Sequence, residues 1–392
     1  MTSGGAEAAA HMERRVLTAD DEIEALAPEW RRLAASAAMS PFASPDWLIP
    51  WWAAYRGHDE ARLLAFREHG SLVGVAPLFR RVASGRRFRL REMGFWGRTA
   101  TPISGGVDIL VAPSAVEPVV ESFLEWLRAE AEPWDAFHYL RSPTASPVPA
   151  ALVAAAAGAG WRSLDLTGEI QSIAMTIDLP EAGSDWTGYL GSKARRNIRR
   201  ELRIFGEKFE GRIEVDRRPE SASTVVAELE RLMARRWGDD ERYFRADPAF
   251  GGFATSALAR MLAERSALVV LARDRDGIAG LLVTLHLNSR AVALLIGLTT
   301  DPRYRTLSLG KALFERAIDE SVALGCRSFD FLWAGAYKED FWHARGRIHR
   351  SGIVARGRAG GLVAARVAAR RAGKSVWRRL PGRPLRDGGR GS

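Results

Sequence analysis

Residues 267–300 read ALVVLARDRDGIAGLLVTLHLNSRAVALLIGLTT, three apolar segments joined by short polar turns. Segments rich in Val, Leu and Ile and bounded by turn residues are typical of β-strands. An amphipathic helix, SLGKALFERAIDESVALG (308–325), and a further strand, RSFDFL (327–332), follow them. The order β-β-β-α-β predicts a mixed sheet with helices on its faces.

The same order of elements occurs earlier in the chain. The strands ARLLAFREHG (61–70), SLVGVAPLFRRV (71–82) and FRLREMGF (88–95), a short strand within 105–113, the helix AVEPVVESFLEWLRAEA (115–131) and the strand WDAFHYL (134–140) make up this copy. We therefore predict a duplicated α/β (α+β) fold with two mixed sheets flanked by helices. The halves would span residues 13–165 and 166–350, with a tail at 351–392. Trp47, Trp51 and Trp52, in a Pro-punctuated helix before the first copy, are expected to be packing residues.

The positive charge of the chain is concentrated at its C-terminus. The net charge is +10, but residues 351–392 hold eleven Arg and Lys and one acid, so the preceding 350 residues are neutral. This Gly- and Arg-rich tail has no clean apolar face and is predicted to be disordered. It could contact tRNA, other phosphates or an anionic membrane surface, or it could only aid solubility.

Composition also argues against several classes of protein. No apolar stretch reaches the roughly 18 to 20 residues of a membrane-spanning helix, and the N-terminus lacks the pattern of a secretion signal. The single cysteine, Cys326, permits no internal disulfide and sits in a strand-like segment, so we expect a cytoplasmic protein with an inert thiol. The seven histidines show no metal-ligand spacing, and no metal is predicted.

The stretch GSKARRNIRRELR (191–203) is predicted to form a two-faced helix. At 100° per residue its apolar residues fall within an arc of about 80°, and most of its cations fall within another. Clustered arginines suit a phosphate-bearing ligand, either an acceptor or the nucleotide end of a donor. The alternative is a solvated face paired with nearby acids. The predicted substrate-binding residues are Arg196, Arg199, Arg200 and Arg203, which would face one anionic ligand in the cleft between the two halves.

Two strand residues are candidates for acid–base chemistry. Asp330 lies between Phe329 and Phe331 in an apolar strand, where a carboxylate must find a partner or shift its pKa. His286, in the strand IAGLLVTLHLNS, would titrate in a useful range. A purely structural role is open for both, since Asp330 could pair with an arginine and His286 could be a packing residue.

Five stretches of the chain together resemble a known family. They are SPFASPDWL (40–48), GVAPL (74–78), SKARRNIRRELR (192–203), SLGKAL (308–313) and FDFLWAGAYKEDFW (329–342). The chain resembles the CelD-like acyltransferases, a branch of the GNAT (N-acetyltransferase) superfamily related to the FemABX aminoacyl-transferases. The resemblance implies two GNAT-like halves, an acyl donor on the second half, a degenerate first half that shapes the acceptor cleft, and a small-molecule or glycan amine as acceptor. The CelD-like branch implies acyl-CoA, most simply acetyl-CoA, as donor, whereas the FemABX branch implies aminoacyl-tRNA.

The resemblance also indicates where a donor would bind. GNAT folds hold the CoA pyrophosphate on consecutive backbone amides at a strand-to-helix turn, where the helix dipole favours an anion. The corresponding residues here are Arg305, Ser308, Leu309, Gly310 and Lys311, with Ser308 in place of the first Gly of the superfamily pattern. A Ser-capped helix with a surface lysine is the alternative interpretation.

The resemblance implies that Tyr337 and Lys338, just past the last strand, face the acyl end of the donor. No Ser-His-Asp or Cys-His spacing is present, which fits direct transfer without a covalent enzyme intermediate. We therefore expect an N-acyltransferase that uses acyl-CoA. The alternatives are a FemABX-like, aminoacyl-tRNA-dependent transferase and a non-catalytic GNAT-like protein that binds anionic partners through its tail.

Overall fold

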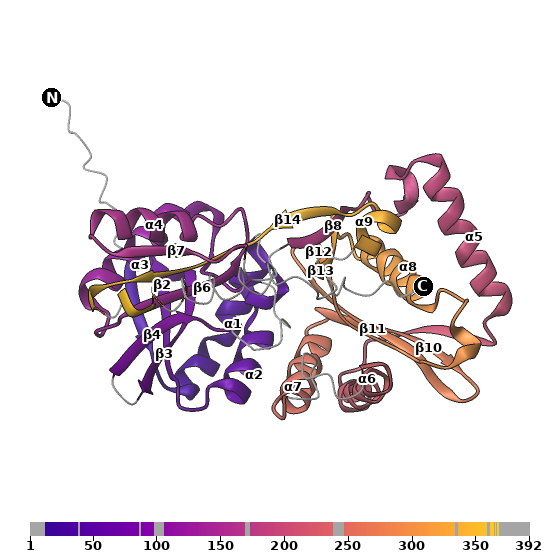
Figure 1. Ribbon diagram of the computed structural model, residues 1–392, viewed down its shortest axis with the longest axis horizontal. Helices are drawn as coiled ribbons and strands as arrows, with labels where there is room; N and C mark the ends of the chain where they lie inside the picture. The colour runs from indigo at the N-terminus through magenta and orange to yellow at the C-terminus, as the bar shows by residue number, and fades with distance from the viewer. Residues whose placement is uncertain are drawn as a thin grey trace, which may run out of the picture.

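The computed structural model places two β-sheets side by side along the long axis of the molecule (Figure 1). It describes residues 12–37, 40–85, 88–97, 106–168, 173–237, 247–333, 336–358, 361–363, 365 and 367. Most of the predicted tail, including everything past residue 367, lies outside these residues.

The first sheet has the strand order β1-β2-β3-β4-β6-β15-β7, and β5 pairs with β3. Its strands are β1 (Glu13–Leu17), β2 (Glu60–Glu68), β3 (Ser71–Gly85), β4 (Phe88–Phe95), β5 (Leu110–Val111), β6 (Ala136–Ser142), β7 (Arg162–Asp165) and β15 (Arg350–Ala355). The accompanying helices are α1 (Asp20–Ser36), α2 (Pro45–Tyr55), α3 (Val116–Glu125) and α4 (Val148–Gly158).

The second sheet has the order β14-β8-β13-β12-β11-β10-β9. Its strands are β8 (Ile173–Asp178), β9 (Gly211–Asp216), β10 (Ala267–Asp274), β11 (Gly277–Leu287), β12 (Arg290–Leu298), β13 (Ser328–Trp333) and β14 (Arg345–Ile348). Helices α6 (Ala222–Trp237) and α7 (Phe250–Ala263) cover one face, and α8 (Leu309–Ala323) covers the other (Figure 1). Helix α5 (Ser192–Lys208) packs outside α8, and the short α9 (Ala336–Trp342) follows β13.

The two sheets correspond strand by strand, which confirms the predicted duplication. Read from β1 and from β9, each sheet has four antiparallel strands and then one parallel pairing, β4 with β6 and β12 with β13. The next position holds β15 in the first sheet and β8 in the second, and the edge position holds β7 and β14. Both halves are therefore built on one plan.

The halves exchange strands at these last positions. β7 belongs to the first sheet but β8, next in the chain, to the second; β14 belongs to the second sheet and β15 returns to the first. β15 pairs with β6 on one side and β7 on the other. The predicted tail boundary at residue 350 therefore cuts through β15. The sequence did not indicate this strand, because SGIVA is a short apolar run inside an Arg-rich region.

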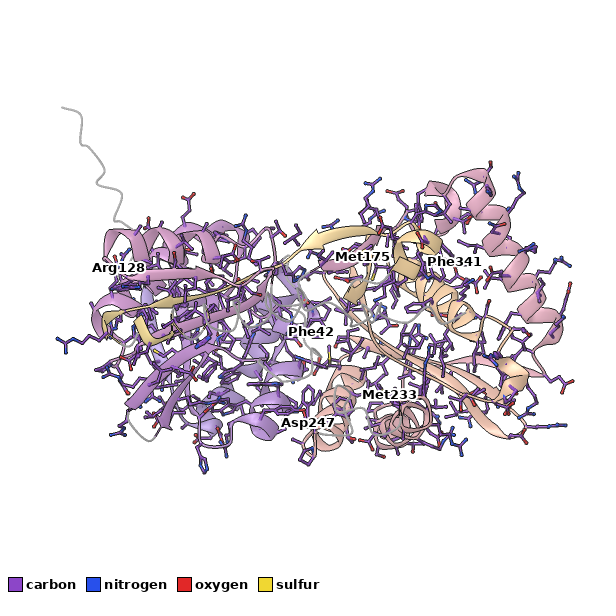
Figure 2. The ribbon with its side chains drawn as sticks, viewed as in Figure 1. Phe42, Arg128, Met175, Met233, Asp247 and Phe341 are labelled. Atoms are coloured by element: carbon purple, nitrogen blue, oxygen red, sulfur yellow. The ribbon has the colours of Figure 1, made fainter. Side chains whose placement is uncertain are left out.

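A packed seam between α2 and α7 joins the halves. Trp47, Trp51 and Trp52 of α2 are buried, as predicted. The ring of Trp47 meets that of Phe253 of α7 edge-on at 4.8 Å, whereas Trp52 stacks on Trp96 of the first half. The Tyr55 hydroxyl donates to Asp247 Oδ2 at 2.9 Å. Figure 2 places Phe42 and Asp247 at this junction.

Because β15 is part of the first sheet, the effect of removing the tail on thermal stability should depend strongly on where the chain ends. Ile353 and Val354 are buried, and burying such a side chain stabilises a fold by about 1.5–3 kcal/mol. We expect a chain that ends at Ala368, which keeps Val363 and Val367 packed against Ile353 and Ala355, to unfold at the temperature of the whole chain. A chain that ends at Arg350 should lose several degrees, as measured by thermal denaturation; equal melting of both would contradict the role of β15.

Candidate active site

The neighbouring strands β12 and β13 are paired over only three residues. Arg290–Val292 pair in parallel with Ser328–Asp330, and beyond this point the two strands have no mutual register. β12 also carries a bulge, because the register with β11 shifts between Val283 and Thr284. Leu332 has a left-handed backbone, with φ of 56°. We call this divergence of the strands the fork; it lies at the carboxyl end of β13, where ligands collect in sheets of this kind.

Asp330 and Lys338 come together at the fork. Phe329 and Phe331 point into the core beneath α8, so Asp330 lies on the opposite face, which the first half approaches. Its carboxylate accepts a 2.6 Å hydrogen bond from the Leu332 amide. The Lys338 ammonium group, in the first turn of α9, donates to the carbonyl oxygen of Phe331.

Burial brings both ionisable groups towards neutrality. It raises the pKa of Asp330 to about 6, although the Leu332 amide and the charges of Lys338, Arg347 and Arg290 oppose the rise. Burial lowers the pKa of Lys338 to about 8, against the opposing effect of Asp330. The pair thus offers a carboxylate able to accept a proton near neutral pH and a cation beside it. Tyr337 precedes Lys338 in α9, but its side chain lies outside the described residues and its role stays a prediction.

His286 does not join this pair. Its Nε2 lies 3.2 Å from the Ser321 hydroxyl oxygen of α8, on the face of the sheet opposite Asp330. Ser321 itself donates to the Ala317 carbonyl, so His286 is the donor to Ser321. Burial lowers the pKa of His286 to about 4, which keeps it neutral. The packing interpretation therefore describes His286 better than the catalytic one. Cys326 is likewise buried, and its pKa is raised to about 11.

The predicted donor loop lines an open groove. Arg305, Ser308, Leu309 and Gly310 border a space of about 390 Å³ together with the end of β12 and Arg236. Ser308 has a left-handed backbone, φ 51°, which explains why the superfamily pattern has Gly at this position. The amides of Leu309 and Gly310 begin α8 and have no acceptor within the helix.

The last predicted loop residue, Lys311, is engaged by an acid that sequence reasoning assigned no role. The Glu201 carboxylate of α5 accepts a 2.9 Å hydrogen bond from the Ser308 hydroxyl and forms an ion pair with the Lys311 ammonium. Lys311 also lies 3.8 Å above the centre of the Phe341 ring. An anion thus already sits at the start of α8, where the helix dipole favours one. This explains a lysine in the first turn of the helix.

Helix α5 has the predicted two faces, but it does not face the junction of the halves. Its apolar residues Ala194, Ile198, Leu202 and Phe205 pack on the core beneath it. The helix lies at the end of the second half remote from the first (Figure 1). The expected place of its arginines, in a cleft between the halves, is therefore wrong.

The four predicted substrate-binding arginines are exposed. Arg199 pairs with Asp185 at 2.8 Å and Arg203 with Glu207 at 2.9 Å. Arg196 and Arg200 are exposed and have no ion-pair partner among the described residues. This arrangement is that of the solvated face, and the substrate-binding role of the four stays an untested prediction.

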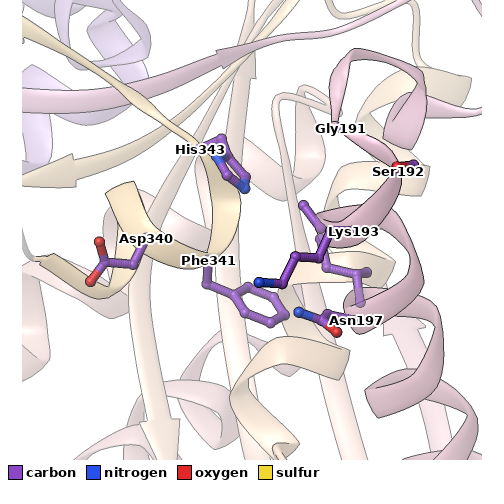
Figure 3. Close-up of a pocket in the computed structure, with 9 residues that line it drawn as sticks. Gly191, Ser192, Lys193, Asn197, Asp340, Phe341 and His343 are labelled. Carbon is purple, nitrogen blue, oxygen red and sulfur yellow. The ribbon is translucent and has the colours of Figure 1, made fainter.

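The inner face of α5 instead borders a pocket that we did not predict. Lys193 and Asn197 line a space of about 470 Å³ with Phe341 and His343 of the α9 region. Figure 3 shows Lys193 and Asn197 pointing towards Phe341, whereas Asp340 points away. Lys193, Asn197 and Glu201 follow one another at intervals of four residues, so they share one side of the helix. This spacing of polar side chains is visible in the sequence and could have indicated a polar side of the helix at the pocket.

Within the described ranges, no three His, Cys, Asp or Glu side chains are grouped so that they could hold a metal ion. In the same part of the chain, no helix is both long and apolar enough to cross a bilayer.

Comparison with known proteins identifies the second half. A family model described as an acetyltransferase (GNAT) domain matches residues 192–341, a range that begins with α5 and contains the donor loop, Asp330 and Lys338. None of the curated proteins compared with the chain matches its sequence.

Solved structures of low sequence identity match most of the chain. The crystal structure of FemX is 11% identical and covers 87% of this chain and 96% of its own, with a TM-score of 0.55. L-PGS from Bacillus licheniformis is 12% identical, covering 88% and 96%, with a TM-score of 0.48. A tandem GNAT protein from the clavulanic acid biosynthesis pathway is 14% identical, covering 88% and 97%, with a TM-score of 0.40.

The FemX likeness extends over both halves and so agrees with the duplicated plan of the sheets. Membership of the CelD-like branch stays a prediction. Residues 192–341 form an acetyltransferase (GNAT) domain within a duplicated GNAT-like fold, and the chain is an acyltransferase.

Proposed function

We propose that the chain transfers an acyl group from an acyl-CoA thioester, most simply acetyl-CoA, directly to an amine acceptor. The observation that carries this proposal is the Asp330–Lys338 pair at the fork. Acyl transfer to an amine needs a group that removes the ammonium proton and a donor that stabilises the oxyanion. Asp330 and Lys338 supply these two functions side by side.

The reaction would proceed in one displacement. Asp330 accepts the proton of the acceptor ammonium, and the freed amine attacks the thioester carbonyl carbon. The C–N bond forms and, as the intermediate collapses, the C–S bond breaks and the thiolate leaves and takes up a proton. The Lys338 ammonium group faces the carbonyl oxygen while it carries negative charge. No enzyme nucleophile is required, and the buried Cys326 is not suited to be one.

The donor groove supports acyl-CoA as the donor. Arg305, together with the amides of Leu309 and Gly310, would hold the diphosphate at the positive end of α8. The pantetheine arm would then extend towards the fork between β12 and β13. This path leads from the loop at the end of β12 to the carboxyl end of β13, where Lys338 lies.

One observation favours a second candidate, an aminoacyl-tRNA-dependent transferase. The Glu201 carboxylate holds Ser308 and Lys311, so it competes with a diphosphate for the start of α8. The FemABX branch, which the sequence also resembles, uses a donor without this diphosphate. Contacts of the tail with tRNA or an anionic membrane, the alternative of a non-catalytic anion-binding protein, and a cytoplasmic location all remain predictions.

Thermal stabilisation separates the two donors. A ligand that binds the native state raises the melting temperature by mass action. We expect acetyl-CoA or a longer acyl-CoA to raise it for both the whole chain and a chain that ends at Ala368, and aminoacyl-tRNA to have no effect. A shift with aminoacyl-tRNA alone would replace the acyl-CoA proposal with the second candidate.

Replacing Glu201 with glutamine should strengthen binding of CoA. The change removes a negative charge from the start of α8 and releases Lys311 to pair with a phosphate, so we expect affinity to rise several-fold in calorimetric titration with CoA. Glu207→Gln is the matched control, because Glu207 lies on the same helix but pairs with the exposed Arg203. Unchanged or weaker CoA binding in Glu201→Gln would argue that the diphosphate does not bind at α8.

The pH dependence of kcat/KM should be bell-shaped. Activity should rise as the pH passes about 6, because Asp330 must lose its proton to act as a base. It should fall as the pH passes about 8, because Lys338 then loses its charge. Asp330→Asn should lower kcat by about 10²–10⁴-fold and remove the acidic limb.

Lys338→Met should remove the alkaline limb of the same profile. Glu339→Gln, which changes an exposed neighbour of Lys338, should keep the whole profile. An unchanged acidic limb in Asp330→Asn would exclude this carboxylate as the base.

A further inference from the structure

The face of the second sheet that carries Asp330 also carries a group of cations. In register, Val292, Asp330, Thr176 and Arg345 form one row across β12, β13, β8 and β14. Arg290 lies two residues before Val292 on the same strand, and Arg347 lies two residues after Arg345. Residues two apart on a strand share a face, so these side chains lie with Asp330.

The side chains of Arg290 and Arg347 converge. An Nη2 nitrogen of Arg347 lies 3.5 Å from the carboxylate of Asp178, which is paired in register with Ser328. Ser328 is in turn the register partner of Arg290. Arg347 therefore reaches back along the sheet towards Arg290, with Asp330 beside this path.

These two cations are poorly neutralised by the protein itself. Arg290 is half-buried, and its guanidinium has no hydrogen bond or ion pair with another described residue. Among the described residues, the Arg347 side chain has only the 3.5 Å contact to Asp178, and 56% of this side chain is exposed. Burial and the charge of Arg347 lower the pKa of Arg290, and the opposing charge of Asp330 does not make up for them. A half-buried guanidinium without an acceptor is costly unless a ligand provides one.

A buried polar group next to Asp330 also has no partner. The Thr176 side chain is 6% exposed, and its hydroxyl has no hydrogen bond within the described structure. Thr176 is the register partner of Asp330 on β8. Unsatisfied buried polar groups are uncommon in native proteins and call for an explanation. A ligand that reached this face could supply the missing hydrogen bond.

We propose that Arg290 and Arg347 bind an anionic group of the acceptor, a carboxylate or a phosphate, beside Asp330. The inference rests on the proposed function, because it names the chemical class of the acceptor at the same site. Binding the anion here holds the acceptor by its charged end and leaves its amine next to the base. The acceptor is thus an amine that carries a negative charge elsewhere, and the arginines of α5 are not needed to hold it.

Titration of the whole chain with inorganic phosphate and, separately, with acetate tests this site. The melting temperature is followed at constant ionic strength. We expect at least one anion to stabilise the wild type, with an apparent affinity at least about fivefold weaker in Arg290→Gln and in Arg347→Gln. The anion that shows this loss identifies the group. Arg275→Gln, at an exposed turn between β10 and β11, is the control and should match the wild type.

Repeating the phosphate titration with CoA present separates this site from the donor groove. If both variants respond to both anions like the wild type, or if neither anion stabilises the wild type, the anion site is overturned. CoA binding should be unchanged in both variants, since neither arginine lines the donor groove. The wild type could instead bind no CoA while the variants still lose anion binding. That result would support the anion site and overturn the acyl-CoA proposal.

Discussion

The short parallel pairing between β12 and β13 is the constraint on which the candidate site depends. Three residues of each strand are held together, and the chain then separates them. The first half repeats the arrangement, with Glu92–Gly94 of β4 paired to Ala136–His138 of β6. A sheet that opens at this point exposes backbone groups and side chains at the carboxyl end of its strands without loss of the core on either side. In the second half, the helix between the two strands, α8, can then aim its positive end at a ligand.

The second constraint is the exchange of strands between the halves. β8 completes the opened side of the second sheet, and β15 completes that of the first, although β15 follows the second half in the chain. Neither sheet is complete without a strand that enters it from a crossing connection. The two halves are therefore one folding unit in this sense, and the face that carries Asp330 is held against the first half.

Much of the fold could be predicted because its signals are local. Alternating strands, one amphipathic helix and a repeated order predicted the duplicated sheets, and the tryptophans of the Pro-punctuated helix were expected to be packing residues. The exchange of β15 could not be predicted, since a five-residue apolar run carries no information about which sheet receives it. For the site, the position of Asp330 in an apolar strand indicated a carboxylate with a shifted pKa, and burial does raise it; its catalytic role stays a prediction.

The sequence also suggested His286 as a candidate for acid–base chemistry. Sequence alone does not show which face of a sheet meets a helix, and His286 lies on the face that packs against α8. The arginines of α5 drew attention through their density, yet the residue of that helix that touches the donor loop is an acid, Glu201. Contacts between a surface helix and a distant loop depend on tertiary packing, which no local pattern encodes. The charge that contacts the start of α8 is therefore a single carboxylate, that of Glu201.

The central claim, that acyl transfer takes place at the fork beside Asp330 and Lys338, is tested most directly by a crystal structure with a non-hydrolysable acetyl-CoA analogue. The account predicts the diphosphate at the start of α8 and the acyl carbonyl oxygen within hydrogen-bonding distance of Lys338 Nζ. An analogue bound elsewhere, with its acyl group remote from β13, would contradict it.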